Sequence, residues 1–330
     1  MRGKQWGPER FRAESGYWRA AILMAAVEVD LFAWMGKKAR SRAAVAAHFG
    51  GDPQGWEIFL DALCAIGLLR KRGKKYANSR FASRHLRGDA AAFLLRDYDA
   101  WQAWGGLAAA LRGGARPNTQ RPFFSDAKKA YRLLRALQVD ARAIAPHLIA
   151  RLPLQRAGTL LDLGGGLGAF AIAFCRRYPR LRATVVEHPR IAPLARRAVG
   201  GAGLGKRMRV IGVDFRRGAL PRGFDTVFLS NVLHSRGADE NRKLLRKVRN
   251  CLKPEGQLIL RDVFLRRDRI APEWTALFSV SLLLHTPRGR CYTLDEIAGW
   301  LRRSGFSRIQ GPFRSSPLSF DPDSVLIAET

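Results

Sequence analysis

The sequence is short of cysteine and has no long apolar run, and each shortage excludes a class of protein. Its four cysteines lie far apart in 330 residues and form no C-x-x-C pair. This disfavours a metal site or a disulfide scaffold and fits a reducing cytoplasm. No stretch of about 18 apolar residues is present, so we expect no membrane-spanning helix. The most apolar N-terminal segment is interrupted by Glu28 and Asp30 and lacks a small-residue cleavage site, which disfavours a secretory signal.

Acidic residues are also scarce, because 27 Asp and Glu stand against 58 Lys and Arg, a formal net charge of +31. Such a charge attracts nucleic acids and anionic surfaces. The alternative is a surface on which arginine has replaced lysine and neutral residues throughout. Apart from a tight cluster at Arg70–Lys75, the basic residues are spread along the chain. We therefore favour the second interpretation, and a nucleic acid partner is the less favoured one.

Residues 1–100 predict a small helical domain that carries a wing. Apolar residues recur at helical spacing from Ala20 to Leu31, a second helix begins at Ser41, and a third follows Asp52. A basic turn between two short extended segments completes a winged-helix arrangement. Because the third helix is too apolar to lie against phosphate, we expect this domain to serve dimerisation rather than DNA binding.

The rest of the chain predicts connecting helices and then an α/β domain. Residues 101–155 have helical spacing with several aromatics, which is typical of a segment that helps to form a pocket. From residue 156 to residue 330, buried strands alternate with helices, with strands expected at 160–163, 183–187, 209–213, 226–230 and 257–264. This alternation predicts a doubly wound, mostly parallel sheet, whose ligands bind beyond the carboxyl ends of the strands.

A glycine-rich loop follows the first of these strands, in the segment Asp162–Gly168. Glycine permits backbone angles that other residues avoid and lets a ligand approach the main chain. Glu187 ends the next strand, where a carboxylate can accept both hydroxyls of a ribose. These two features are shared by sites for NAD and for S-adenosylmethionine (SAM). The acid and aromatic pair Asp214-Phe215 after the third strand, and the turn Leu252–Gly256, are more typical of SAM sites.

In this order, the motifs resemble those of the SAM-dependent O-methyltransferases of the plant caffeate and bacterial antibiotic (carminomycin-type) family. The resemblance runs from Ser15 to Ala328 and implies a Rossmann-like methyltransferase domain behind an N-terminal winged-helix dimerisation domain. It also implies SAM as the cofactor. The cofactor-binding residues that it implies are Asp162, Gly164, Gly165, Gly166, Gly168, Glu187, His188, Asp214, Phe215, Ser230 and Asn231.

The same resemblance implies a catalytic pair, with His234 as the general base and Asp262 as the acid that orients it. Two departures from the family pattern surround this pair. Cys291 stands where the family has a second acid, and Ser235-Arg236 replaces an Asp-Trp pair whose tryptophan packs on the cofactor. These departures leave open a C- or N-methyltransferase of the same fold, with a tetrapyrrole- or amine-type substrate.

The expected protein is thus a cytoplasmic, homodimeric, SAM-dependent O-methyltransferase that acts on a hydroxyl of an aromatic or polyketide-like small molecule. No metal is expected. A basic nucleic-acid-binding protein or methyltransferase and an NAD enzyme are the alternatives. The residues expected beside the acceptor are Trp101, Trp104, Leu137, His285 and Cys291.

Overall fold

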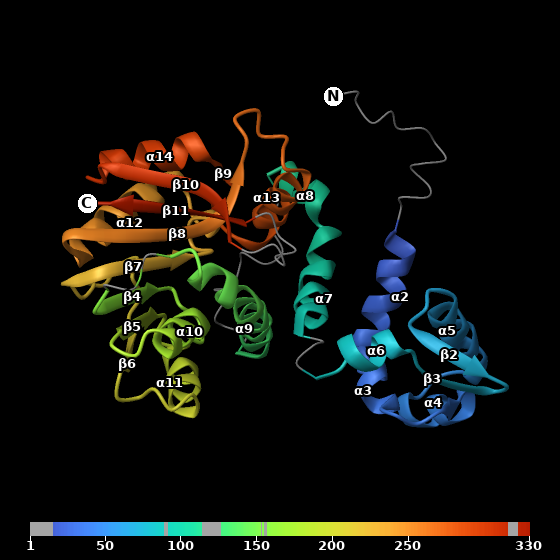
Figure 1. Ribbon diagram of the computed structural model, residues 1–330. Coiled ribbons are helices and arrows are strands. Elements are labelled where there is room, and N and C mark those ends of the chain that lie inside the picture. The colour runs from blue at the N-terminus through green and yellow to red at the C-terminus, as the bar shows by residue number, and fades with distance from the viewer. Residues whose placement is uncertain (1–15, 89–91, 114–126, 153, 155–156, 316–322) are drawn as a thin grey trace. The chain divides into compact units, whose positions relative to one another are not determined.

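The computed structural model describes residues 16–88, 92–113, 127–152, 154, 157–315 and 323–330. The chain divides into two compact units, Met1–Asp99 and Ala100–Thr330 (Figure 1). Each unit has its own core of buried apolar side chains.

The first unit combines short helices with a small antiparallel sheet of strand order β1-β3-β2. Its helices are α2 (Tyr17–Glu28), α3 (Leu31–Met35), α4 (Arg42–Phe49), α5 (Pro53–Ala65) and α6 (Arg80–His85). Its strands are β1 (Arg40–Ser41), β2 (Leu69–Arg72) and β3 (Lys75–Asn78). Helix α7 (Ala92–Trp104) crosses the boundary between the units. The three-helix core with a basic hairpin matches the winged-helix prediction.

Local capping explains where these helices begin. The Ser41 hydroxyl accepts a hydrogen bond from the Ala44 amide at 3.2 Å, and the Asp52 carboxylate accepts one from the Gly55 amide at 2.8 Å. Both are N-cap interactions that satisfy an otherwise unpaired helical N–H. The apolar spacing from Ala20 to Leu31 is divided between α2 and α3, because Asp30 adopts a left-handed conformation with φ 55°.

The second unit is built on a twisted sheet of order β10-β11-β8-β7-β4-β5-β6, and β9 pairs with β8. The strands are β4 (Thr159–Leu163), β5 (Arg182–Glu187), β6 (Met208–Gly212), β7 (Phe224–Ser230), β8 (Leu252–Leu265), β9 (Tyr292–Thr293), β10 (Arg308–Arg314) and β11 (Asp323–Glu329). The neighbouring strands β6, β5, β4, β7 and β8 pair in parallel. Strand β11 pairs antiparallel with β8, and β10 pairs antiparallel with β11. The predicted fold class is confirmed. One detail differs, since Leu252–Gly256 belongs to β8 rather than to a separate turn.

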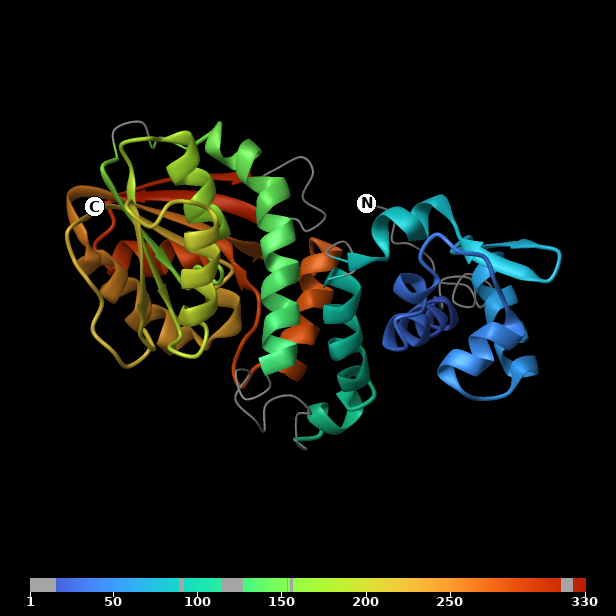
Figure 2. The same ribbon diagram turned by 90° about the horizontal axis from the view of Figure 1, so that it is seen from below.

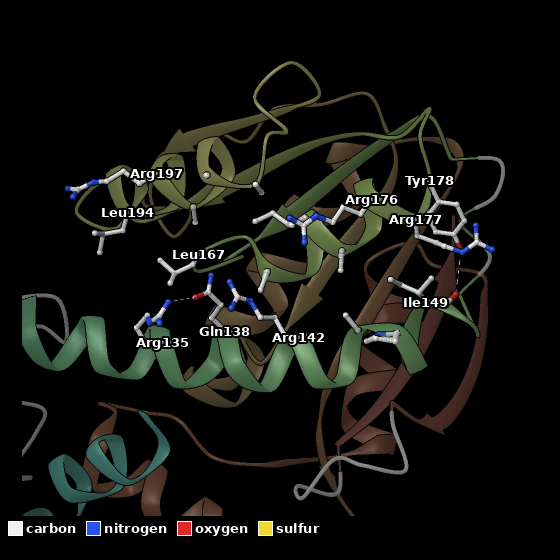
Figure 3. Close-up of a pocket in the computed structure, with 18 of the residues that line it drawn as sticks. Arg135, Gln138, Arg142, Ile149, Leu167, Arg176, Arg177, Tyr178, Leu194 and Arg197 are labelled. Atoms are coloured by element: carbon white, nitrogen blue, oxygen red, sulfur yellow. Dashed lines mark hydrogen bonds between the residues drawn. The ribbon is translucent and has the colours of Figure 1, made fainter. Parts of the chain in front are cut away.

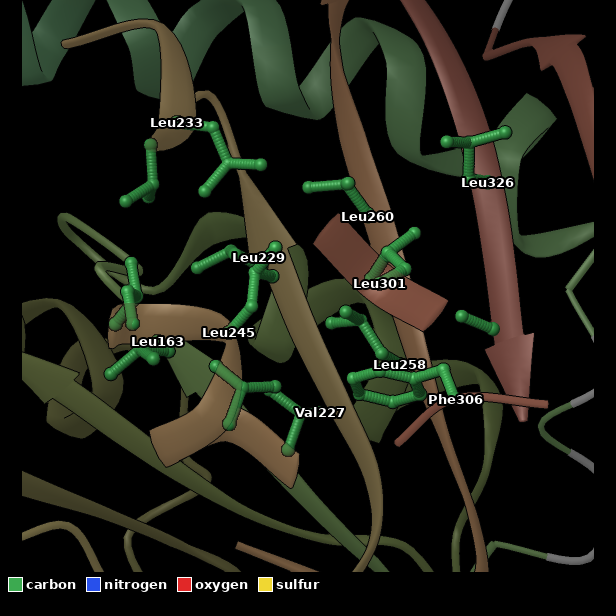
Figure 4. Packing of buried hydrophobic residues seen from close by; sticks show 14 of the residues in the cluster. Leu163, Val227, Leu229, Leu233, Leu245, Leu258, Leu260, Leu301, Phe306 and Leu326 are labelled. Atoms are coloured by element: carbon green, nitrogen blue, oxygen red, sulfur yellow. The ribbon is translucent and has the colours of Figure 1, made fainter. Parts of the chain in front are cut away.

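Helices cover both faces of this sheet, and α8 packs on α13. The helices of this unit are α8 (Leu107–Leu111), α9 (Ala127–Ile149), α10 (Ala169–Arg177), α11 (Ala192–Gly201), the 3-10 helix η3 (Leu233–Ser235), α12 (Ala238–Cys251), α13 (Glu273–His285) and α14 (Leu294–Arg303). Helices α12 and α14 pack on one face, where leucines from β4, β7 and β8 meet them (Figure 4). Helices α9, α10 and α11 lie on the other face (Figure 2). None of the helices within the described residues is long and apolar enough to cross a membrane.

The alternation of side chains along β8 separates two charged neighbours. Leu258 and Leu260 point to the α12 and α14 face, and Ile259 points to the α9 and α10 face. Because strand side chains alternate, Arg261 lies on the second face and Asp262 on the first. The sequence Leu260-Arg-Asp-Val263 thus delivers one charge to each side of the sheet.

Candidate functional site

The predicted cofactor residues collect at the carboxyl edge of the parallel strands. The glycine loop follows β4, Glu187 ends β5, and Asp214 and Phe215 follow β6. Strand order reverses direction at β4, with β5 on one side and β7 on the other. A crevice at such a reversal is the usual ligand position in an open α/β sheet.

The glycine loop disfavours side chains for two different reasons, backbone angle and space. Gly164 and Gly166 have φ of 74° and 57°, which glycine tolerates and other residues avoid. At Gly165 the constraint is space, since a Cβ there would lie 2.6 Å from the carboxyl group of Asp162. The loop is therefore held directly against a buried acid.

Two carboxylates lie beneath the loop. Glu187 accepts hydrogen bonds from the amides of Gly166 at 2.8 Å and His188 at 2.7 Å. Burial raises the pKa of Glu187, although these two N–H donors oppose the rise. Burial and the nearby Glu187 raise the pKa of Asp162 to about 7. The main chain thus fixes Glu187 in place, whereas Asp162 is close to protonation at neutral pH.

The third acid has a different environment. Arg216 donates to both carboxylate oxygens of Asp214, at 2.8 and 2.7 Å, and this lowers the pKa of Asp214 to about 2. The next residue, Phe215, is almost fully buried beside Gly164. The guanidinium carbon of Arg236 lies 4.6 Å from the centre of the Phe215 ring. An ionised acid, an aromatic face and a planar cation therefore adjoin one another.

Two unpartnered polar atoms among the residues at this edge provide a test of its fit to an adenosyl ligand. Within the described residues, Asp162 Oδ2 and Arg236 Nε are buried and have no hydrogen-bond partner. SAM offers both donors and acceptors: ribose hydroxyls, an ammonium group and the ring nitrogens of adenine. A carboxyl oxygen in need of a donor and an N–H in need of an acceptor fit this ligand.

The remaining predicted cofactor residues lie at the rim of the crevice. His188 accepts from the Arg190 amide and its carbonyl begins the turn into α11, which is a structural role at the helix start. Asn231 has φ 56°, and its backbone N–H donates to the backbone carbonyl of Arg261 at 2.9 Å. The hydroxyl of Ser230 accepts from Arg261 at 3.1 Å, so it lies toward the α9 and α10 face. Gly168 precedes α10, with φ 76°.

The predicted base and its acid are in direct contact. His234 Nδ1 lies 2.6 Å from Asp262 Oδ1, and the Asp262 carboxylate also accepts from the amides of Leu233 and Val263, at 3.1 and 2.9 Å. A carboxylate accepts hydrogen bonds, so the contact orients Nδ1 of the imidazole as its donor and leaves Nε2 as the ring nitrogen that can exchange a proton with a ligand. The pair therefore fixes the orientation of the ring and which nitrogen is available.

The turn that carries His234 is fixed by its neighbours. The buried side-chain amide of Asn241, on α12, donates to the carbonyl of Leu233 at 2.9 Å. Gly289 packs so closely that a Cβ there would lie 2.5 Å from the His234 carbonyl oxygen. Small residues and buried hydrogen bonds thus hold η3 against the loop between α13 and β9.

Aromatic residues on α13 lie near the imidazole, and no motif in the sequence indicated their place. Phe278 meets the His234 ring edge-on, with centroids 5.2 Å apart. Trp274 stacks on Phe278 at 5.0 Å and an interplanar angle of 18°. Their spacing of four residues, about one helical turn, is the only sequence feature that could have indicated a shared helix face. Many core helices have the same spacing, so only the fold shows that they lie near His234.

Two of the predicted acceptor-side residues also belong to this region. Cys291 is buried among Val263, Leu265 and Leu282, and burial raises the pKa of its thiol to about 12. It fills space and is a poor nucleophile. His285, at the end of α13, has Nδ1 2.7 Å from the Ser281 carbonyl oxygen, while its buried Nε2 has no partner in the described part of the chain.

The other predicted acceptor-side residues are partly exposed. Trp101, Trp104 and Leu137 have exposed fractions of 36%, 38% and 37%. Ala103, between the two tryptophans, packs against Leu284, the neighbour of His285. Within the described residues, no hydrogen bond or ring contact joins these three side chains to His234.

Arg261 is a buried charged residue that the sequence analysis did not single out. Its guanidinium is 2% exposed, pairs closely with Asp323 on β11, and lies 3.6 Å from Asp140 on α9. A charge within a run of buried apolar residues was the signal that could have identified it. The contact between Arg261 and Asp140 joins α9 to the sheet, on the face opposite His234.

A cavity of about 1160 Å³ lies on that opposite face, between α9, α10 and α11 (Figure 3). Five arginines contribute to its lining: Arg135, Arg142, Arg176, Arg177 and Arg197. None of the predicted site residues lies in its lining. Leu167 of the glycine loop does line it, so the basic cavity adjoins that loop.

Comparison with protein families decides between the remaining interpretations. Residues 121–307 match an O-methyltransferase domain, and residues 12–88 match an O-methyltransferase dimerisation domain. The chain belongs to the SAM-dependent O-methyltransferases. SAM is therefore the cofactor of this O-methyltransferase, and the NAD interpretation left open by the glycine loop is set aside.

Characterised relatives agree with this membership. The O-methyltransferase is 30% identical to 3-hydroxy-5-methyl-1-naphthoate 3-O-methyltransferase of Streptomyces sahachiroi, over 92% of this chain and 90% of that protein. It is also 30% identical to the tetracenomycin polyketide synthesis 8-O-methyltransferase TcmO of Streptomyces glaucescens, over 91% of each chain. An O-methyltransferase family protein from Burkholderia thailandensis has a similar structure, with a TM-score of 0.84, 25% identity and 97% of each chain covered.

Proposed function

We propose that this O-methyltransferase methylates a hydroxyl group of an aromatic or polyketide-like small molecule, with His234 as the general base. The observation that carries the proposal is the contact of 2.6 Å between His234 Nδ1 and Asp262 Oδ1. It leaves Nε2 as the proton acceptor. Imidazole is suited to this role because its pKa lies near neutral pH.

Bound SAM supplies an electrophilic methyl group on a positively charged sulfur. The Nε2 of His234 accepts the proton of the acceptor hydroxyl as that oxygen becomes a nucleophile. Asp262 is a positioning residue: it fixes the tautomer and stabilises the imidazolium that results. The packing of η3 against Asn241 and Gly289 keeps the ring in place, which favours a productive orientation of the reacting atoms.

The cofactor would be held by the loop Gly164–Gly168 and the acids beneath it. Glu187 would accept from the ribose hydroxyls, and Asp214 and Phe215 would adjoin the adenine. Asp162 Oδ2, which is buried and unpartnered in the described structure, would accept a hydrogen bond from the ligand. The exclusion of side chains from Gly165 supports close approach of the ligand to the main chain.

An aromatic acceptor is supported by the residues around His234. Trp274 and Phe278 form a stacked pair, and Phe278 makes a T-shaped contact with the imidazole. Flat apolar ligands favour such surfaces because aromatic pairs contribute beyond the area they bury. The names of two relatives, a naphthoate 3-O-methyltransferase and a polyketide 8-O-methyltransferase, point to the same class. His285, Trp101, Trp104 and Leu137 remain candidates for the rest of the acceptor site.

We assign dimerisation to residues 1–100, part of the acceptor pocket to residues 101–155, and SAM binding to residues 156–330. The match to a dimerisation domain supports a homodimer. The acids on α5 argue against a nucleic acid partner, since Glu57 pairs with Arg42, and Asp61 pairs with Lys71 at 2.7 Å. The four cysteines are free, which supports the cytoplasm as its compartment.

The proposal is tested by supplying methyl-labelled SAM with a panel of hydroxylated bicyclic aromatics and the matching amines. We expect label on oxygen, with turnover that rises through the pH range in which imidazole loses its proton. The Asp262→Asn variant should lower kcat and shift that profile, while KM for SAM stays unchanged. Label on carbon or nitrogen that persists in a His234→Ala variant would favour the C- or N-methyltransferase alternative.

A further inference from the structure

Arg236 is a half-buried cation that forms no ion pair within the described residues, although several acids lie near it. Its guanidinium lies over Phe215, and burial lowers its pKa. Glu187, Asp214 and Glu240 contribute favourable electrostatic interactions, yet none of them comes within the 4.0 Å of an ion pair in the described part of the chain. The Nε–H is buried and donates to nothing there. A buried donor of this kind has a free energy cost unless a ligand accepts its hydrogen bond.

The backbone of Arg236 is held firmly, so this side-chain position is built into the fold. The Arg236 amide donates to the Leu233 carbonyl at 3.2 Å. The hydroxyl of Tyr292, on β9, donates to the Arg236 carbonyl. The following residue, Gly237, donates its amide to Glu240 at 3.0 Å and begins α12. From this turn the side chain reaches Phe215, and its guanidinium carbon lies 4.6 Å from the centre of that ring.

The ligand group that suits this environment is a flat ring with acceptor nitrogens. Phe215 provides an apolar face, Asp214 is an ionised acceptor for an exocyclic amine, and Arg236 Nε–H is a donor in need of an acceptor. Adenine has all three complementary features: a flat π face, an N6 amine and unprotonated ring nitrogens. A carboxylate ligand would match the cation but would be repelled by Asp214 and Glu187.

We propose that Arg236 binds the adenine ring of SAM, with its Nε–H donating to a ring nitrogen and its plane supported by Phe215. This assignment rests on SAM binding at the carboxyl edge but not on the proposed acceptor or on His234. Arg236 is therefore a cofactor-specificity residue that no comparison assigns.

The experiment measures binding by calorimetry without any acceptor. The ligands are S-adenosylhomocysteine, adenosine, and the 1-deaza, 3-deaza and 7-deaza forms of adenosine. The variants are Arg236→Ala, Arg236→Lys and the control Arg242→Ala, which removes an exposed arginine of α12 that pairs with Asp239. Thermal unfolding of each variant shows whether it is folded.

We expect Arg236→Ala to lower the affinity for adenosine and for S-adenosylhomocysteine equally, by about 10-fold. Arg236→Lys keeps the charge but loses the planar donor, so it should restore only part of that loss. Wild-type protein should discriminate against one deaza analogue by about 10-fold, and Arg236→Ala should bind that analogue and adenosine alike. Arg242→Ala should match the wild type.

Three outcomes would overturn the assignment. Unchanged discrimination among the deaza analogues in Arg236→Ala would mean that no ring nitrogen accepts from Arg236. If Arg236→Ala weakened the binding of S-adenosylhomocysteine but not that of adenosine, Arg236 would contact the amino-acid end of the cofactor instead of the adenine. Absence of binding to the wild type would remove the carboxyl-edge site as well, whereas failure of the proposed hydroxyl transfer would leave these binding results unaffected.

Discussion

The two ends of the site at the carboxyl edge are built by different means. At the cofactor end, main-chain groups fix the key carboxylate: the Gly166 and His188 amides donate to Glu187. At the base end, a side chain fixes a side chain, since His234 depends on Asp262, 28 residues further along the chain. The first end is sensitive to added volume at Gly165, whereas the second requires the alignment of two strands.

This difference determines how each end should fail. A carboxylate held by amides loses its position only when the backbone moves, so added volume is the damaging change. An imidazole held by a carboxylate loses its tautomer when either partner changes, so removal of one functional group is the damaging change. Variants at the two ends should therefore separate cofactor affinity from turnover.

The largest expected effect is at the base end. His234→Ala should lower kcat by about 10²- to 10⁴-fold, the usual contribution of a positioned general base. The Kd for SAM should stay within about twofold of the wild type, because His234 lies outside the glycine loop. Single-turnover transfer and calorimetry measure the two quantities. A comparable loss of SAM affinity would contradict the separation of the two ends.

The next effect concerns Asp162, whose pKa is raised to about 7 by burial and by Glu187. In the unfolded chain the same carboxyl ionises near its ordinary pKa, so between about pH 4 and pH 7 the folded state binds a proton that the unfolded state has released. The free energy of unfolding therefore falls as pH rises through this range and levels off above it. Asp162→Asn removes the ionisable group and with it this loss of stability.

The advantage of Asp162→Asn over the wild type should grow from near zero at about pH 4 toward at most ~4 kcal/mol above pH 7. Urea unfolding without cofactor, at matched pH values, measures the difference. If the free energies of unfolding of the two proteins changed with pH in parallel, Asp162 would ionise in the folded state at its ordinary pKa. The carboxyl group would then lie in a more polar environment than its burial indicates.

A smaller effect is expected from added volume in the loop. Gly165→Ala places a Cβ 2.6 Å from the Asp162 carboxyl group. Overpacking of this kind costs about 1–3 kcal/mol. If the loop moves away to relieve it and SAM binding must reverse that shift, the Kd for SAM should rise by about 5- to 150-fold. Gly200→Ala on α11 is the matched control, since a Cβ there meets nothing within 4 Å. Equal Kd values for the two variants would mean that the loop yields freely.

The sequence predicted the cofactor end better than the base end, and the structure explains why. A glycine loop after one strand and an acid after the next are local patterns, and parallel pairing brings the two together. The contact of His234 with Asp262 came from resemblance, and the fold supplies the geometry through the alternation along β8. Trp274, Phe278 and Arg261 could not be placed from the sequence, because their roles depend on neighbours distant in the chain. For Arg236 the resemblance indicated a position near the cofactor, and only the fold shows its contact with Phe215.

The smallest effect should come from Cys291, which lies near the base end without contributing a hydrogen bond to the pair. Its thiol is 1% exposed and its pKa is raised to about 12, so a thiol reagent should leave it unmodified in the folded enzyme. Cys291→Ala should lower the free energy of unfolding by about 1 kcal/mol through a small cavity and leave kcat within about twofold. Urea unfolding and steady-state turnover measure both. A loss of turnover as large as that of Asp262→Asn would make Cys291 part of the machinery that positions His234, and the base end would then depend on three side chains rather than two.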